Sequence, residues 1–167
     1  MKGLEPSDIH CILAASGWLD LKNPTEARNE IDQVSPEARK HPDVLEMRWM
    51  ICESLGDWPG ALMIARDIIQ STPEQSSGWL HQAYALRRVP DAGLEHALKA
   101  LLAASNLFPD EPLIAYNLAC YLAQLRQLTE AWDWLLKAKS LLGKKKLLQL
   151  ALSDPDLEPF RDRLRTL

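Results

Sequence analysis

Histidines and cysteines are the residues of this sequence most suited to chemistry, because they bind metals and act as acids, bases or nucleophiles. The four histidines lie far apart in the sequence: His10, His41, His81 and His96. No two of them form the pair, one helical turn apart, that binds zinc in helical metalloproteases. The three cysteines are equally scattered and form no Cys-x-x-Cys motif: Cys11, Cys52 and Cys120. We interpret them as small apolar residues in a reducing compartment.

Carboxylates and loops provide no catalytic motif either. Glu26, Glu30 and Asp32 fall on helix faces that should be solvated. The sequence has no glycine-rich phosphate loop and no Gly-x-Ser-x-Gly motif of a serine hydrolase. We therefore expect no enzyme activity, no metal site and no cofactor.

The overall composition is that of a globular protein. Of the 167 residues, 47% are hydrophobic and 25% are charged, which excludes a disordered chain. The net charge of −4 argues against a nucleic-acid partner, because such proteins usually concentrate basic residues on one face. The one basic run, Lys144–Lys146, is interpreted as a solvated junction between helices.

No segment of the sequence predicts export or membrane insertion. Residues 1–6 lack the long apolar run of a signal peptide. No stretch approaches the 18 consecutive apolar residues that a membrane-spanning helix requires. We expect a cytoplasmic protein without a membrane partner.

The apolar pattern predicts helices throughout the chain. Apolar residues recur at three- and four-residue spacing, and prolines divide the periodic segments into pieces of about one helix each. Ser7 is expected to cap the first helix, and Gly56 is expected to end the third in a left-handed conformation. The predicted helices span residues 7–21, 24–34, 42–55, 58–71, 74–88, 92–107, 111–125 and 128–142, followed by 144–152 and 159–164.

Four alanines recur at a nearly constant interval in these helices. Ala27, Ala61, Ala97 and Ala131 are separated by 34, 36 and 34 residues. A period of 34 residues with two helices per period indicates an array of helix-turn-helix repeats. Such arrays usually hold another chain and do not catalyse reactions, so the period favours a binding scaffold.

The repeats resemble tetratricopeptide repeats. The third repeat matches the pattern of that family best, with Trp79 and Ala83 in its first helix and Ala97 and Pro109 in and after its second. The second repeat departs from the pattern at Trp49, where a small residue is usual, which predicts a wider or rotated helix crossing. The ending, residues 154–161, is similar to the closing segment of many bacterial tetratricopeptide proteins.

This resemblance implies an all-α fold and a single domain over residues 1–167. The expected architecture is a right-handed superhelical α-solenoid of about four repeats followed by capping helices. The repeats would span residues 8–41, 42–75, 76–111 and 112–143, and the capping segment would span 144–167.

The resemblance also implies a binding groove, because the first helix of each tetratricopeptide repeat lines the concave side. Methionine and tyrosine would anchor apolar side chains there, while Asn117 and Arg87 would bind backbone or carboxylate groups. An alternative is that several of these residues pack against a neighbouring helix, and for Met47 and Met50 both interpretations stay open. The groove positions are Ile12, Ser16, Met47, Met50, Leu80, His81, Tyr84, Arg87, Leu113, Tyr116, Asn117 and Cys120.

The function that this resemblance implies is a scaffold or adaptor that binds a peptide or protein segment. Some family members clamp the C-terminal carboxylate of heat-shock chaperones with cationic groove residues. The corresponding positions here include Ile12, Met47 and His81, so the cationic pair is missing and we reject that ligand.

Two alternative functions stay open. The chain could be a homo-oligomerisation module, because Trp132 and Trp134 lie on different sides of one helix and an exposed tryptophan marks an interface. The leucine-rich tail could contribute to the same contact, or the capping helices could cover both tryptophans. The second alternative is a repeat chaperone of the bacterial type III secretion kind, which has a similar length and repeat number.

Overall fold

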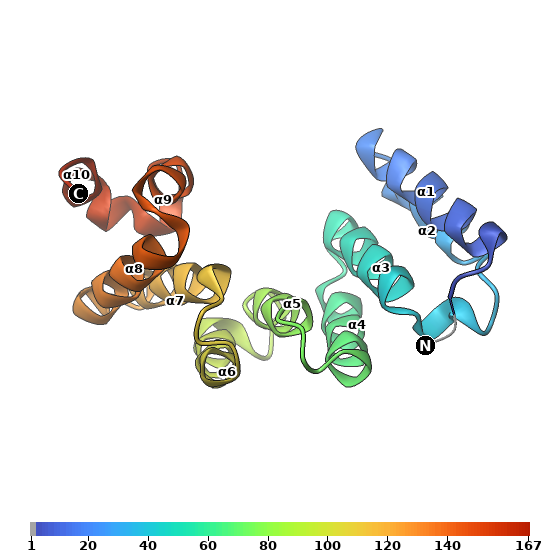
Figure 1. Ribbon diagram of the computed structural model, residues 1–167, viewed down its shortest axis with the longest axis horizontal. Coiled ribbons are helices and arrows are strands. Elements are labelled where there is room, and N and C mark those ends of the chain that lie inside the picture. Colours follow the sequence, from blue (N-terminus) through green and yellow to red (C-terminus); the bar gives the residue numbers. More distant parts are fainter. Residues whose placement is uncertain (1–2) are drawn as a thin grey trace. The chain divides into compact units, whose positions relative to one another are not determined.

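The computed structural model describes residues 3–167, so Met1 and Lys2 of the segment examined for a signal peptide lie outside it. Residues 3–167 form helices and connecting turns without a strand (Figure 1). The α-helices are α1 (Pro6–Asp20), α2 (Pro24–Ile31), α3 (Pro42–Leu55), α4 (Trp58–Ser71), α5 (Ser77–Leu86), α6 (Gly93–Leu107), α7 (Pro112–Gln124), α8 (Leu128–Leu142), α9 (Lys144–Ala151) and α10 (Arg161–Arg165). The short 3₁₀ helices are η1 (Ala38–Lys40) and η2 (Pro155–Phe160). The all-α fold is thus confirmed.

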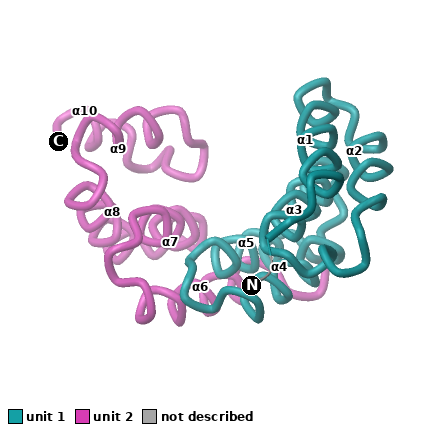
Figure 2. Tube along the Cα trace, turned by 45° about the vertical axis from the view of Figure 1, so that its right-hand side comes forward, with its two compact units in different colours: residues 1–89 teal, residues 90–167 magenta. Residues whose placement is uncertain are grey.

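The helices fall into two compact units, coloured separately in Figure 2. We call residues 1–89 the N-terminal unit and residues 90–167 the C-terminal unit. The boundary follows Val89, between the two helices of the predicted third repeat. Helix α5 therefore belongs to the N-terminal unit and α6 to the C-terminal unit.

Local turn chemistry places most helix ends where the sequence predicts them. Helices α3 and α4 have the predicted bounds, because Gly56 adopts a left-handed φ of 69° between them. The Asn23 side chain accepts a hydrogen bond from the Glu26 N–H and caps α2. The predicted Ser7 cap is wrong: α1 begins at Pro6, whose fixed φ suits the first helical position, and Glu5 is the N-cap.

The helix whose bounds differ most from the prediction is the one predicted over residues 74–88. Helix α5 spans only Ser77–Leu86, and residues 73–76 form turns. The Gln75 N–H donates to the Thr72 carbonyl at 3.0 Å, and the Trp79 indole reaches back to the Pro73 carbonyl at 3.4 Å. These contacts hold the segment after α4 in turns and delay the start of α5.

The four periodic alanines all lie in helix interfaces. Ala27, Ala61, Ala97 and Ala131 are completely buried. In the N-terminal unit, Ala27 belongs to one apolar cluster and Ala61 to another. A methyl side chain at these positions lets neighbouring helix backbones approach closely, which explains the recurrence of alanine in the sequence.

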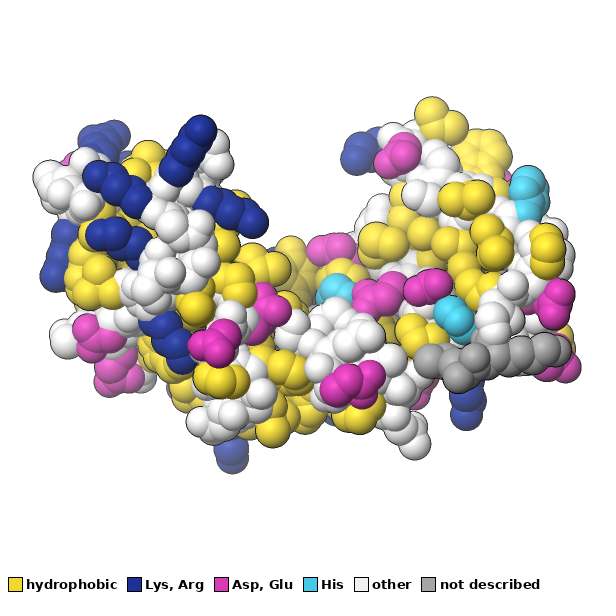
Figure 3. Space-filling view, in the orientation of Figure 1, with side chains coloured by type: hydrophobic (Ala, Val, Ile, Leu, Met, Phe, Trp, Pro, Cys, Tyr) yellow, Lys and Arg dark blue, Asp and Glu magenta, His cyan; other side chains and the backbone are white. Residues whose placement is uncertain are grey.

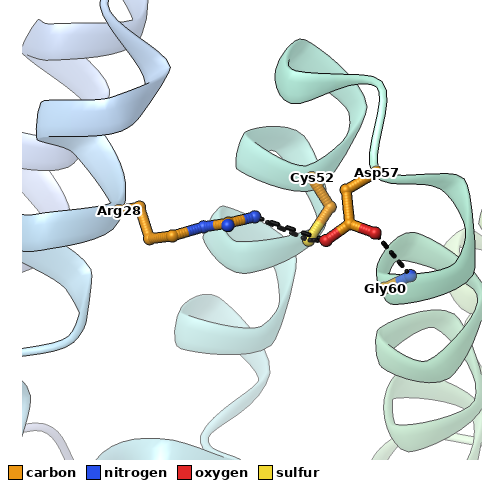
Figure 4. A network of polar contacts seen from close by, with 4 residues as sticks. All are labelled: Arg28, Cys52, Asp57 and Gly60. Carbon is orange, nitrogen blue, oxygen red and sulfur yellow. Dashed lines mark hydrogen bonds and ion pairs between the residues drawn. The ribbon is translucent and has the colours of Figure 1, made fainter.

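A polar network joins α2, α3 and α4 in the N-terminal unit (Figure 4). The Asp57 side chain caps α4 by accepting a hydrogen bond from the Gly60 N–H at 3.0 Å. Its other carboxylate oxygen pairs with the Arg28 guanidinium at 3.4 Å, and the same guanidinium nitrogen lies 3.9 Å from the Cys52 sulfur. Arg28 thus ties the second helical pair to the first.

A buried carboxylate fixes the beginning of α1. Asp8 accepts hydrogen bonds from the Ser35 N–H at 2.7 Å and from the Ser35 hydroxyl at 2.9 Å. The backbone hydrogen bond from Ser35 is the main reason that the pKa of Asp8 lies below its ordinary value. The contact links the start of α1 to the segment that follows α2.

The C-terminal unit is organised around α7, which packs against α6, α8 and η2. Nine residues of α7 are buried, so the helix is covered on nearly every side. Within residues 3–167, no helix combines the length and apolar character needed to cross a membrane.

Candidate functional site

An apolar surface lies along α1 of the N-terminal unit. Ile9 is 44% exposed and Leu13 is 66% exposed, whereas Cys11 and Ala15 on the opposite side of the helix are buried in the core. Figure 3 shows hydrophobic side chains gathered over α1 and α3. They border a shallow pocket of about 440 Å³ whose lining residues are Leu4, Ile9, Ile12, Leu13, His41 and Asp43. This apolar pocket is the strongest candidate for a binding surface in the N-terminal unit.

The predicted groove residues of α1 border this surface only in part. Ile12 lines the pocket and also packs against the core beneath it, so its side chain is half-buried. Ser16, one turn further along α1, is also half-buried. Ile9 and Leu13 were not among the predicted groove residues, although their four-residue spacing opposite Cys11 and Ala15 is the signal that could have identified them.

The two methionines of α3 lie in different environments. Met47 is 4% exposed and belongs to the same apolar cluster as Ala15 and Ile31, so it is a core residue. Met50 is 38% exposed on the surface of α3. Met47 belongs to the core that α3 shares with α1 and α2, whereas Met50 lies outside both apolar clusters of the unit.

The predicted residues of α5 mainly join helices within the N-terminal unit. The His81 Nε2 lies 2.7 Å from Glu46 Oε2, and the His81 ring stacks on Trp49 with 3.7 Å between ring centroids. Burial raises the pKa of Glu46, but the contacts of its carboxylate with His81 and Ser77 together outweigh burial, so the pKa lies below its ordinary value. Tyr84 meets Trp49 edge-on at 6.0 Å. These contacts hold α5 against α3.

The other two predicted positions of this region are Leu80 and Arg87. The Leu80 side chain is half-buried in the helix. Arg87 follows the last residue of α5 as its C-cap and is half-buried. The neighbouring Arg88 places its guanidinium 3.6 Å from the centre of the Tyr84 ring, a cation–π contact.

Two of the predicted residues of α7 are covered by residues 154–167 of the same chain, which we call the closing segment. Tyr116 is 8% exposed, and its hydroxyl donates a hydrogen bond to Asp154 Oδ2 at 2.7 Å. The Cys120 thiol lies 3.6 Å from the same oxygen, and the Gln124 amide donates to Asp156. Burial and the hydrogen bond to Asp154 raise the pKa of Tyr116 well above its ordinary value. Tyr116 and Cys120 are thus interior residues of the C-terminal unit.

Two predicted residues of α7 lie beside that covered region. Leu113 is 44% exposed at the first turn of α7. The Asn117 amide donates to the Leu113 carbonyl at 2.8 Å, within its own helix. For the covered positions Tyr116 and Cys120, no pattern in the sequence indicates the contact with Asp154, which lies 38 residues after Tyr116.

The three cysteines are buried, and one of them lies beside two carboxylates. Burial raises the pKa of the Cys11 and Cys52 thiols, which disfavours the reactive thiolate. Potential ligand atoms of Cys120, Asp154 and Asp156 lie within 4.8 Å of one another. The Asp154 carboxylate accepts hydrogen bonds there from the Tyr116 hydroxyl and the Asp156 N–H.

The two tryptophans of α8 differ in how deeply they are buried. Trp132 is 7% exposed, beneath Phe160 at 5.5 Å between ring centroids and the Arg163 guanidinium at 3.7 Å. Trp134 is half-buried, and the Lys137 ammonium lies 4.8 Å from its ring. The closing segment therefore covers Trp132, which removes one of the two features that favoured self-association.

Comparisons with known proteins identify the fold. No protein-family model matches the sequence, and no curated protein matches it significantly. One similar solved structure is MamA, residues 41 to the end, from Desulfovibrio magneticus RS-1: the TM-score is 0.69 at 17% sequence identity, over 98% of this chain and 94% of that chain. Another is TTC0263, a tetratricopeptide protein of Thermus thermophilus, with a TM-score of 0.68 at 18% identity over 96% of this chain and 100% of that chain. The chain therefore has a fold of the tetratricopeptide type, as its repeats indicated.

Proposed function

We propose that this chain is a protein-interaction scaffold and that it binds a peptide or protein segment on the first-helix side of the N-terminal unit. The observation that carries the proposal is the pair of exposed apolar side chains, Ile9 and Leu13, beside the pocket on α1. Grouped apolar side chains on a surface favour contact with another protein. The tetratricopeptide-type fold supports the same conclusion, since helical repeat arrays commonly present their first helices to a ligand.

The binding surface in this proposal differs from a groove that uses every repeat equally. Ile12 and Met50 contribute to it together with Ile9 and Leu13, because all four have surface-accessible side chains on α1 or α3. Tyr116 and Cys120 are excluded from it, since the closing segment covers them.

A matched pair of variants tests this proposal. Leu13→Ser changes a residue of the pocket that is 66% exposed, and Met63→Ser changes a residue of α4 that is 64% exposed. Proteins captured from a lysate by the wild type are quantified for both variants, after circular dichroism has shown that each variant stays folded. We expect Met63→Ser to retain a partner that Leu13→Ser loses. Equal capture of every partner by Leu13→Ser and the wild type would contradict the proposal.

A further inference from the structure

The N-terminal unit carries the net negative charge of the whole chain. Residues 1–89 contain 13 Asp and Glu against 9 Lys and Arg, whereas residues 90–167 contain 10 of each. The excess of four acidic residues in the N-terminal unit equals the net charge of −4. The proposed binding surface therefore belongs to the acidic part of the molecule.

Acidic residues follow the same helix stripes as the exposed apolar side chains. On α1, Asp20 lies seven residues after Leu13, two helical turns along the same face. On α3, Asp43 and Glu53 lie seven residues before and three residues after Met50, again on one face. Asp43 also lines the pocket beside Leu13, and its side chain is 67% exposed. The apolar surface is thus accompanied by carboxylates along both helices.

Several cations of the same unit are engaged elsewhere. The guanidinium of Arg28 pairs with Asp57 at 3.4 Å, and that of Arg48 pairs with Asp32 at 2.9 Å. In Figure 3, the face over α1 and α3 shows hydrophobic side chains with Asp, Glu and His, and Lys and Arg appear only at its margins. The surface therefore presents apolar and negative groups together.

We propose that the segment bound on this surface is a cationic, amphipathic segment of another protein. Its bulky apolar side chains would pack against Ile9, Leu13 and Met50, and its Lys or Arg side chains would lie opposite Asp20, Asp43 and Glu53. Charge complementarity carries this assignment, because an acidic segment would meet like charges at these positions. The inference rests on the proposed function and specifies the chemistry of the partner.

The experiment begins with a random peptide library displayed on phage and selected on the folded wild-type protein and, in parallel, on Leu13→Ser. Peptides enriched only on the wild type are expected to carry net positive charge together with Leu, Ile, Met or Phe. Enriched peptides that are neutral or acidic would overturn the inference while leaving the proposed function intact. Peptides that bind Leu13→Ser as well as the wild type would instead overturn the proposed function.

The most enriched peptide is then synthesised and titrated against two charge variants with the same number of changes. Asp20→Asn/Asp43→Asn/Glu53→Gln neutralises the surface, and Glu30→Gln/Asp67→Asn/Glu74→Gln neutralises acidic residues outside it. We expect the first variant to bind about ten-fold more weakly at low salt, with a smaller difference at high salt, and the second to bind nearly as the wild type does. Equal affinities of the two variants would overturn the inference.

A synthetic peptide of residues 144–152 serves as the last comparison, because this basic, leucine-rich segment belongs to the chain itself. We expect it to bind at least ten-fold more weakly than the selected peptide. Equally tight binding would make a second copy of the chain the occupant and would overturn the assignment to another protein.

Discussion

Helices α1 and α7 both begin with a proline and are both rich in apolar residues, yet α1 is largely open to solvent and α7 is largely buried. Helix α7 buries nine of its 13 residues, whereas α1 buries only Asp8, Cys11 and Ala15 of its 15. The difference arises because α6, α8 and η2 of the closing segment all pack against α7, whereas α1 packs mainly against α2 and α3. Within each unit, the availability of a first helix for binding thus depends on what else in the chain packs against it, and not on its own sequence pattern alone.

The contrast is also one of polar chemistry. In the closing segment, Asp154 accepts a hydrogen bond from Tyr116, and Asp156 accepts one from Gln124. These polar groups of α7 therefore have partners within the chain. On α1, the exposed side chains include Ile9 and Leu13, and Leu13 has two thirds of its surface in contact with solvent. An apolar surface of this kind gains free energy when a partner removes it from water.

The largest effect is expected from truncating the closing segment's aromatic anchor. Phe160→Ala removes a ring that is 4% exposed and packs on Trp132, so it should lower the free energy of unfolding by about 3 kcal/mol. Leu13→Ala is the matched change on the open helix and should alter it by less than about 0.5 kcal/mol. Urea denaturation followed by circular dichroism measures both. Similar losses for the two variants would remove the contrast between covered and open helices.

A smaller loss is expected from deleting a single hydroxyl beneath the closing segment. Tyr116→Phe removes the donor to Asp154 and leaves its acceptor without this bond, which should cost about 1 kcal/mol. Tyr84→Phe is the control in the N-terminal unit, because the Tyr84 hydroxyl makes no hydrogen bond within the described residues. If Tyr84→Phe destabilised the protein as much as Tyr116→Phe in urea denaturation, the hydrogen bond to Asp154 would not explain the loss.

A pH-dependent effect distinguishes the N-terminal unit. The pKa of Asp8 is lowered in the folded protein, so its stabilising contribution is fully present above the unfolded value of about 3.9 and is lost as the pH falls through the lower folded value. Asp8→Asn should therefore be less stable than the wild type near pH 7, with the difference narrowing below about pH 4. Urea midpoints between pH 7 and pH 3 measure this trend, with Asp67→Asn as an exposed control. A constant difference across this range would contradict it.

The sequence predicted most of what is local in this fold. The bounds of α3, α4 and α8 follow from adjacent turn residues such as Gly56 and Gly143, and the periodic alanines identified the buried helix interfaces. Leu13 was also identifiable in principle, because its exposure follows from the helical periodicity of α1 alone.

What could not be predicted depends on contacts between distant segments. Tyr116 has the same kind of position in its repeat as other predicted groove residues, but Asp154 buries it from 38 residues away. His81 forms a hydrogen bond with Glu46, 35 residues earlier, and so links two helices. Neither contact can be predicted from a single sequence. Helical periodicity indicates which face of a helix is buried, but not which distant residue packs against that face.

The reactivity of the buried cysteines reports how often each unit opens locally. Cys11 and Cys52 lie buried in the N-terminal unit and Cys120 in the C-terminal unit, and none forms a disulfide. A thiol reagent reaches each sulfur only when the surrounding helices separate, so its reaction rate reports the frequency of that local opening. Cys120 lies beneath the closing segment. The rate of its modification therefore measures how often that segment separates from α7.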